Sequence, residues 1–343
     1  MRPWTRSHPR RSIGARIHEI GEERERRMAE DGEEAEFAEF LMPMVRRRGE
    51  EETIKERLVP KADCYVETEE VKKAKDKVKL WLNADYPVHI IGPTGCGKST
   101  LSQRIADELG KPTVWVNGDE TMTTADLVGG YFKIEIESLR DKFIHTVLKA
   151  RDVIRKGWVD NHLTIACKYG YTFVYNDFSR AKPVANNILL SVFQEGILEL
   201  PTRFGEERYI KVHPEFRAIL TSNSVDYAGI HRPQDALLDR MVGVYMDFYD
   251  FDTEVEIVKA HSGVSEDEAR RIVGAIRRLR EKLPDAEKLG TRAAIMIAKG
   301  LQTIGGRCED LLEEFCLDIL ATKVKGPVDL AAKTKLVREV VTL

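Results

Sequence analysis

The sequence lacks the features of a disulfide-stabilised or zinc-binding protein. Its five cysteines are an odd number, and no two of them form a C-x-x-C pair. The eight histidines are scattered along the chain, so no cluster of cysteine and histidine has the spacing of a zinc site. These absences favour a reduced, cytosolic compartment over a secreted disulfide framework.

Long apolar runs and a strong excess of one charge are also missing. No apolar stretch approaches the ~18 residues that a membrane-spanning helix needs, and the Arg-rich start of the chain has no apolar core of the kind found in secretory signals. The net charge of −3 gives no overall basic field that would attract nucleic acid or anionic lipid. We therefore expect a cytoplasmic protein that binds neither membranes nor nucleic acid.

Three segments of the 343-residue chain differ in composition. Residues 1–60 hold an Arg-rich stretch followed by a dense mixture of acids and bases, which is typical of a charged extension, helical or disordered. Residues 61–250 alternate short apolar runs with helical patterns, which is typical of an α/β fold with a parallel sheet between helices. Residues 251–343 show helical periodicity alone and predict a separate helical domain.

Short apolar runs in the α/β segment predict five strands, and the periodic patterns between them predict helices. Two further runs, 197–201 and 209–212, flank a polar turn that contains Gly205 and predict a β-hairpin before the fourth core strand. The capping-box pattern at 265–268 predicts a helix start. The predicted strands are 88–91, 113–116, 172–175, 216–221 and 242–248; the predicted helices are 98–109, 139–156, 183–195, 252–261, 265–283, 291–303 and 308–322.

The strongest functional signal is a complete G-x-x-x-x-G-K-S motif that follows a predicted strand and opens a predicted helix. This is the context of a P-loop, which binds the phosphates of a nucleoside triphosphate. Its glycines let backbone N–H groups converge on the β-phosphate, and the helix N-terminus favours negative charge. We expect Lys98 to reach the β- and γ-phosphate oxygens and Ser99 to bind Mg²⁺. The motif consists of Gly92, Pro93, Thr94, Gly95, Cys96, Gly97, Lys98 and Ser99.

Two further predicted strands end in polar residues. The apolar run 173–175 is followed by Asn176 and Asp177, at the place where P-loop ATPases carry an acid that holds the Mg²⁺ shell and often a second acid that activates water. The next core strand ends at Asn223, a residue that can lie between the two nucleotide-facing strands and orient water. We therefore predict that Asn176 belongs to the metal site and that Asp177 and Asn223 act on the attacking water.

These motifs together resemble those of AAA+ ATPases of the MoxR class. Within that class the chain is most similar to the gas vesicle protein N family, nearly continuously over about residues 63–263. The similarity is weak in the helical domain and absent from residues 1–60. The class resemblance is carried by the P-loop, Asn176 and Asp177 with 178–181, the hairpin, 221–223 and 237–240; the family resemblance is carried by 86–89, 117–119, 126–130, 158–161, 166–170, 185–187, 209–214 and 227–229.

The resemblance implies a fold, an activity and further site residues. It implies an AAA+ core with a β-hairpin before sensor 1, a helical lid, and an ATPase that uses ATP and Mg²⁺ and works as a ring, most commonly a hexamer. Asn223 matches sensor 1, Arg240 matches the arginine finger that reaches into a neighbouring subunit's ATP site, and Arg292 matches sensor 2 in the lid. The implied partners are other copies of the chain and other gas vesicle proteins, with which the protein would associate in the cytoplasm.

The residues at positions 176 and 177 depart from the family, whose members typically carry Asp-Glu there. Asn176 can hydrogen-bond a metal-bound water but adds no negative charge, and Asp177 is one methylene shorter than glutamate. Three functions therefore stay open on the sequence alone. They are ATP-driven remodelling in gas vesicle assembly, a MoxR-like activase of the CbbQ and NorQ kind that inserts metal or cofactor into a partner enzyme, and a nucleotide-binding scaffold with impaired hydrolysis.

Overall fold

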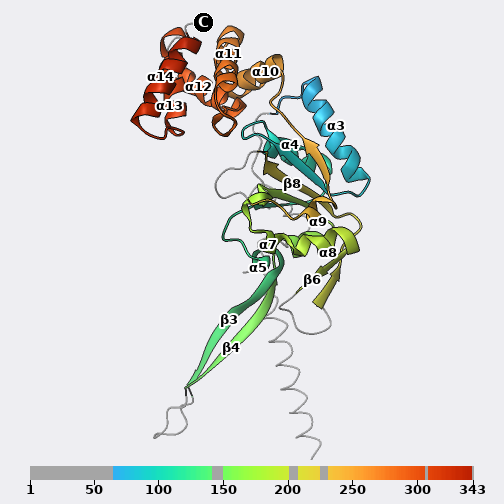
Figure 1. Cartoon of the computed structure of the whole chain (residues 1–343). Coiled ribbons are helices and arrows are strands. Elements are labelled where there is room, and N and C mark those ends of the chain that lie inside the picture. The colour runs from blue at the N-terminus through green and yellow to red at the C-terminus, as the bar shows by residue number, and fades with distance from the viewer. Residues whose placement is uncertain (1–64, 141–149, 201–207, 225–230, 306–307, 342–343) are drawn as a thin grey trace, which may run out of the picture. The chain divides into compact units, whose positions relative to one another are not determined.

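The computed structural model describes residues 65–140, 150–200, 208–224, 231–305 and 308–341 (Figure 1). All of them belong to the larger of the two compact units of the chain, Leu58–Leu343. The extension expected over residues 1–60 lies outside the described residues, and so do Gly205 and the stretch 227–229. None of the helices in the described part combines the length and the apolar character that crossing a membrane requires.

The core of the described unit is the five-stranded parallel sheet that the sequence predicts. The strand order is β2-β5-β8-β1-β9, and every neighbouring pair is parallel. The last strand ends at Tyr245, three residues earlier than predicted, and the others match closely. The strands are β1 (Val88–Gly92), β2 (Thr113–Asn117), β5 (Thr172–Asn176), β8 (Arg217–Asn223) and β9 (Val242–Tyr245).

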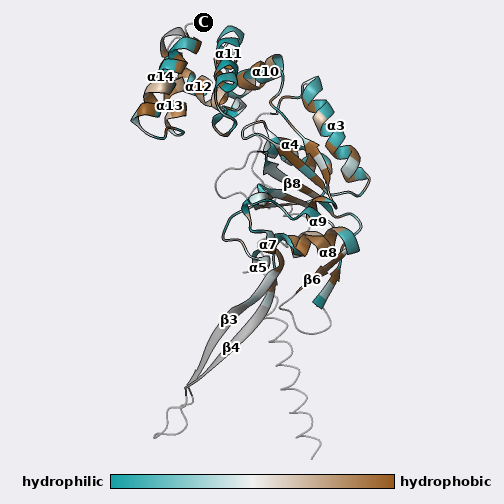
Figure 2. Ribbon diagram, in the orientation of Figure 1, coloured by the Kyte–Doolittle hydropathy of each residue, from teal (hydrophilic) through white to brown (hydrophobic). Residues whose placement is uncertain are grey.

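Apolar packing on the sheet explains why these runs become strands. β1 and β5 are buried almost along their whole length, as expected for parallel strands that are covered on both faces. Leu82 of α3 (Glu69–Asn83) and Leu101 of α4 (Lys98–Glu108) belong to the same buried cluster as Ile90 of β1. Figure 2 shows α3 as largely hydrophilic, in keeping with one buried stripe on a helix that otherwise faces water.

The helix predicted over residues 139–156 is wrong, because its described residues, 139–140 and 150–156, belong to a two-stranded ribbon (Figure 1). β3 (Gly129–Arg140) runs antiparallel to β4 (Ala150–Asp160), with Gly129 opposite Asp160 and Arg140 opposite Ala150. The missed signal is the alternation of apolar and charged residues over 133–137, which has the period of two that a strand requires.

The predicted β-hairpin before the fourth core strand is confirmed. β6 (Ile197–Glu199) pairs antiparallel with β7 (Tyr209–Lys211), and β8 follows in the chain. The single helix predicted over 183–195 is instead two helices, α7 (Pro183–Asn186) and α8 (Ile188–Glu195). Besides α3, the sequence did not predict the core helices α5 (Thr124–Val128) and α6 (His162–Tyr169). The short helix that the resemblance implies before Arg240 is α9 (Asp235–Leu238).

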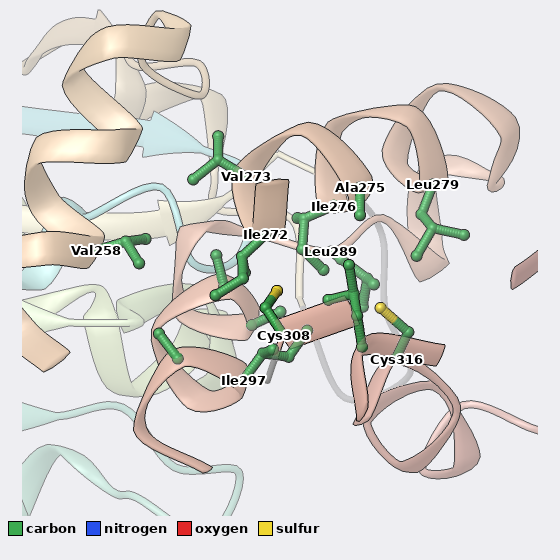
Figure 3. Packing of buried hydrophobic residues seen from close by; sticks show 14 of the residues in the cluster. Val258, Ile272, Val273, Ala275, Ile276, Leu279, Leu289, Ile297, Cys308 and Cys316 are labelled. Carbon is green, nitrogen blue, oxygen red and sulfur yellow. The ribbon is translucent and has the colours of Figure 1, made fainter. Parts of the chain in front are cut away.

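After β9 the described elements are all helical, as predicted for the last segment. The capping box is present: the N–H of Glu268 donates to Ser265 Oγ at 3.3 Å, and the N–H of Ser265 donates to the Glu268 carboxylate at 3.1 Å. Ile272, Ile276 and Ile297 lie in the buried cluster that joins these helices (Figure 3). The helices are α10 (Phe251–Ser262), α11 (Glu266–Lys282), α12 (Thr291–Ile304), α13 (Cys308–Ala321) and α14 (Pro327–Val341), of which the last was not predicted.

Candidate nucleotide-binding and hydrolysis site

The P-loop, residues 92–99, connects the carboxyl end of β1 to the start of α4, as its sequence predicts. Gly97 occupies the N-cap position of α4 with a φ of 97°, so the helix begins at Lys98. The first N–H groups of a helix have no partner within the helix and carry a partial positive charge. An anion at this point of the loop would therefore be stabilised by the backbone itself.

Lys98 lies buried at this helix start and binds only neutral oxygens. Its side-chain ammonium donates to the carbonyl oxygens of Gly92 at 2.9 Å and Pro93 at 2.8 Å, and to Oδ1 of Asn223 at 3.1 Å. Lys98 is 6% exposed, and this burial lowers the pKa of its ammonium group, while the nearby Asp177 carboxylate opposes that shift. A buried cation with neutral hydrogen-bond partners favours the binding of an anionic group such as a phosphate.

Asn176 is the centre of a hydrogen-bond network at the carboxyl end of the sheet. Ser99 Oγ donates to Asn176 Oδ1 at 2.7 Å, and Thr221 Oγ1 donates to the same oxygen at 3.0 Å. On its other side, Asn176 Nδ2 donates to Asn117 Oδ1 at 3.1 Å, and this oxygen also accepts a 3.0 Å hydrogen bond from Trp115 Nε1. Both ends of the Asn176 amide are therefore matched by partners of the correct polarity.

Asp177 follows directly and has a left-handed backbone, with φ of 50° and ψ of 42°. This conformation costs an L-residue roughly 1 kcal/mol, although aspartate tolerates it better than most residues. The N–H of Asp177 donates to Thr221 Oγ1 at 2.9 Å, so one threonine holds both Asn176 and Asp177. The left-handed step separates the two side chains, and it is Asn176, not Asp177, that meets the P-loop serine.

The start of lid helix α12 lies against the P-loop. A Cβ atom on Gly290, the residue before this helix, would be 2.6 Å from the carbonyl oxygen of Thr94, so the two backbones approach as closely as glycine permits. A Cβ on Gly95, where φ is 82°, would be 3.2 Å from the Cα of Gly290 and 3.7 Å from the Cβ of Arg292. The structure thus brings the predicted sensor-2 residue, Arg292, to the P-loop.

A cavity of about 160 Å³ opens between the P-loop and the lid. It lies beside the phosphate-binding loop and is closed by side chains of α10 and α12, as a pocket for the rest of a nucleotide would be. Tyr249, which is 7% exposed, forms part of its wall. The residues that line it include Tyr65, Gly95, Gly97, Thr100, Tyr249, His261 and Arg292.

A buried carboxylate fixes the start of α12. Glu254 of α10 is 1% exposed and accepts hydrogen bonds from Thr291 Oγ1 at 2.7 Å, from Arg280 Nη2 at 2.8 Å and from Arg277 Nη1 at 2.9 Å. Because Thr291 precedes Arg292, this ion-pair network supports the segment that presents Arg292 to the P-loop. This network could not be predicted from the sequence, since a glutamate on an amphipathic helix is typically exposed.

Arg240 is the one predicted site residue that the structure does not bring to the P-loop of its own chain. Val242 of β9 lies opposite Val88 of β1, so Arg240 lies at the amino end of the sheet, whereas the P-loop follows its carboxyl end. The guanidinium of Arg240 donates to Gln194 Oε1 at 2.7 Å and also to the carbonyl oxygen of Ala236.

Two residues of the site, Asn117 and Thr221, are not predicted as site residues by the sequence. Asn117 ends β2 and Thr221 lies near the end of β8, so both are polar groups at the carboxyl edge where parallel strands of the sheet end together. The same signal that pointed to Asn176 and Asn223 could have pointed to them. Their contribution is to orient Asn176 rather than to approach the P-loop.

The parallel sheet, the P-loop and the polar strand ends define an AAA+ P-loop ATPase, and the family AAA domain (dynein-related subfamily) matches residues 87–241. The chain is 48% identical over 320 residues to Gas vesicle ATPase GvpN of Haloferax mediterranei, covering 93% of this chain and 92% of that protein. It is 54% identical to Gas vesicle ATPase GvpN1 of Halobacterium salinarum, over 81% and 80% of the two chains. The chain belongs to the GvpN family of gas vesicle ATPases. Protein NorQ of Paracoccus denitrificans is a more distant relative, 27% identical over 72% of this chain and 86% of that protein.

Proposed function

We propose that this ATPase works with Mg²⁺ as a ring oligomer that remodels protein complexes during gas vesicle assembly. The observation that carries the catalytic part is the meeting of Lys98, Ser99, Asn176 and Asn223 at the carboxyl end of the sheet, joined by hydrogen bonds of 2.7 to 3.1 Å. A P-loop ATPase needs a cation, a metal-binding hydroxyl and polar groups for water at this place. The four side chains supply these three requirements.

The residues at the P-loop fit a Mg²⁺ ion. Mg²⁺ prefers oxygen ligands and is commonly bound by one or two protein groups together with substrate phosphates and water. Ser99 would bind the ion through Oγ, and Asn176 would accept a hydrogen bond from one of its waters, since their oxygens already lie 2.7 Å apart. When bound, the ion neutralises charge on the phosphates during phosphoryl transfer. Neither protein group is charged, so the phosphates of ATP would provide most of the attraction.

The chain's other predicted site residues act on the phosphates and the attacking water in this proposal. Lys98 and the N–H groups of the P-loop bind the phosphates, and Arg292 contacts them from the lid. Asn223 orients the water and Asp177 accepts its proton. Because position 176 is neutral and Asp177 has a short side chain, we expect slow turnover with a high requirement for Mg²⁺.

The position of Arg240 supports a ring, because an arginine at the opposite end of the sheet can serve only the ATP site of another subunit. A cationic finger of this kind accelerates hydrolysis by roughly 10³–10⁵ in well-studied P-loop proteins. ATP bound between subunits stabilises the assembled state, so we expect a hexamer that forms more readily with ATP and Mg²⁺. Light scattering at saturating ATP and Mg²⁺ tests this, and a strictly monomeric protein would contradict it.

The role in gas vesicles rests on the names of relatives that are 48% and 54% identical to this chain over at least four fifths of their length. We expect the protein to act in the cytoplasm, in contact with other gas vesicle proteins. Deletion of the gene should leave cells with absent or stunted vesicles. An allele with Lys98→Ala should fail to rescue, whereas Lys111→Ala, a change at a half-exposed surface ion pair, should rescue fully.

The Lys98→Ala protein also tests nucleotide binding directly. We expect it to fold and to bind ATP at least about tenfold more weakly, because hydrogen bonds to a charged group contribute roughly 1.5–3 kcal/mol. Unchanged ATP affinity would contradict the site. Normal vesicles in the deletion strain, together with loss of activity in a partner oxidoreductase or carboxylase, would favour the alternative role as an activase.

A further inference from the structure

His89 is a buried side chain below the site for which nothing so far gives a role. It lies on the central strand β1, three residues before the P-loop, and is 5% exposed. Its Nε2 atom is 2.8 Å from Ser222 Oγ on the neighbouring strand β8. Its ring meets the ring of Phe178 edge-on, with centroids 4.9 Å apart and planes at 86°.

Both contacts of His89 fall on residues next to predicted hydrolysis residues. Ser222, 5% exposed, lies between Thr221 and Asn223 in the chain. Phe178, which is fully buried, follows Asp177. One imidazole therefore touches the two strand ends from which the water-binding residues of the proposed mechanism arise.

We propose that His89 is a positioning residue for hydrolysis, which holds Asn223 through Ser222 and Asp177 through Phe178. This rests on the roles of Asn223 and Asp177 in the proposed function. It concerns the geometry of the attacking water rather than the binding of ATP, because the described hydrogen bonds of Lys98 and Ser99 go to residues other than His89.

The left-handed backbone of Asp177 explains why such support is needed. A residue in a disfavoured conformation persists only where its surroundings hold it there. On one side Thr221 Oγ1 accepts from the N–H of Asp177 at 2.9 Å. On the other side Phe178 is locked by burial and by its edge-on contact with the His89 ring.

Histidine is suited to this place for a reason that an aliphatic residue does not meet. A valine or leucine would fill the space but leave the Ser222 hydroxyl buried without its partner, which is unfavourable. A phenylalanine would keep the aromatic contact and lose the hydrogen bond. Burial lowers the pKa of His89 to about 4, so at neutral pH the ring is uncharged and one nitrogen stays available to Ser222.

The test compares His89→Phe, Ser222→Ala and their double variant in the full chain with ATP and Mg²⁺. Each single change should lower kcat by about tenfold, because small displacements of a reacting group cost up to ~10² in rate. The KM for ATP and the affinity of a fluorescent ATP analogue should change by less than about twofold, because the P-loop is untouched. The double variant should be no slower than the slower single variant, because both changes remove one interaction. His89→Gln keeps a polar atom that can bond to Ser222, so its kcat should lie between those of His89→Phe and the wild-type protein.

His162→Phe is the control, since His162 is partly buried and burial also lowers its pKa, but it lies on α6, outside the hydrogen-bond network of the site. It should reduce thermal stability without lowering kcat. The proposal is overturned if His89→Phe and Ser222→Ala keep the wild-type kcat, if their rate losses simply multiply in the double variant, or if His162→Phe lowers kcat as much as His89→Phe at an equal loss of thermal stability. A wild-type protein without Lys98-dependent ATP turnover would instead overturn the proposed function.

Discussion

The hydroxyl of Ser99 donates a 2.7 Å hydrogen bond to the side-chain oxygen of Asn176, across the gap between the P-loop helix and the end of β5. This bond shows that position 176, and not position 177, faces the P-loop serine. Both positions depart from the usual Asp-Glu pair, and the one that lies beside the P-loop serine is the uncharged one, Asn176. Its amide nitrogen is matched by Asn117, whose oxygen is in turn held by Trp115.

The first prediction concerns a carboxylate at this position. Asn176→Asp should raise kcat and lower the Mg²⁺ concentration for half-maximal activity, because a negative charge beside Ser99 would strengthen the attraction to the ion. The Ser99 and Thr221 hydroxyls can still donate to it. The lost donor to Asn117 should cost about 1 kcal/mol of stability. Adding Asp177→Glu should raise the rate further, since a glutamate reaches one methylene closer to the water.

Steady-state hydrolysis measured over a series of Mg²⁺ concentrations checks this prediction. Asn117→Ala is a useful control, because it removes the partner of the Asn176 amide without adding charge and should leave the Mg²⁺ requirement high. If Asn176→Asp changes neither the rate nor the Mg²⁺ dependence, position 176 does not belong to the metal site.

The second prediction uses Arg240 and the P-loop lysine together. Arg240→Ala should lower kcat by roughly 10³ and leave ATP affinity unchanged, because a finger delivered by a neighbour acts on the transition state. An equal mixture of Arg240→Ala and Lys98→Ala subunits should regain about a quarter of the wild-type activity. About half of the subunits in a mixed ring have an intact P-loop, and about half of these lie next to a subunit with an intact Arg240. An inactive mixture would show that Arg240 does not act across an interface. Arg232→Ala, at an exposed ion pair nearby, should have no effect.

The third prediction is a loss of stability on mild acidification. Burial lowers the pKa of His89 from 6.5 to about 4, so between these values the unfolded chain binds the proton and the folded chain does not. Stability is therefore complete above pH 6.5 and falls by about 3 kcal/mol as the pH drops to 4. Denaturant unfolding at pH 7, 6 and 5 should show a shallower decline for His89→Gln. Parallel curves for the two proteins would contradict the assignment, because His162 acts equally in both.

The fourth prediction concerns the buried carboxylate of the lid. Glu254→Ala leaves the guanidinium of Arg280, itself 8% exposed, without its buried partner. Breaking a buried pair in this way typically costs 3–5 kcal/mol, so we expect about that loss in the free energy of unfolding. ATP affinity should fall as well, because Thr291 loses the contact that holds the start of α12. Glu256→Ala, on the exposed side of the same helix, should cost less than about 0.5 kcal/mol.

Those parts of the fold and site that depend on local chemistry could be read from the sequence. The P-loop has a fixed spacing because phosphate binding requires it, and Asn176 and Asn223 follow short apolar runs that could only be buried strands. Because parallel strands end at the same edge of the sheet, residues that follow these strands in the sequence lie close together in the fold. Lys98 is hydrogen-bonded to Asn223, and Ser99 is hydrogen-bonded to Asn176.

What could not be read depends on contacts between distant residues. Glu254 becomes buried only because Arg277, Arg280 and Thr291 come from other helices to neutralise it. Part of the β3–β4 ribbon has a helical pattern in the sequence, and its strands are defined by pairing partners that lie between 10 residues (Arg140 and Ala150) and 31 residues (Gly129 and Asp160) apart in the chain. Arg240 remains a prediction, since a single chain does not contain the site that it would serve.

The contact between Gly95 and Gly290 limits the travel of the lid in one direction. Neither residue has a side chain to move aside, and an added Cβ on Gly290 would already collide with the Thr94 carbonyl oxygen. The backbone before helix α12 is therefore in van der Waals contact with the P-loop and cannot approach it further at this point. A bound nucleotide could keep Gly290 in this position or displace it, but could not bring Gly290 closer to the P-loop. The backbone at the start of α12 is already in contact with the P-loop. Any closer approach to the phosphates would therefore have to come from the long, exposed side chain of Arg292.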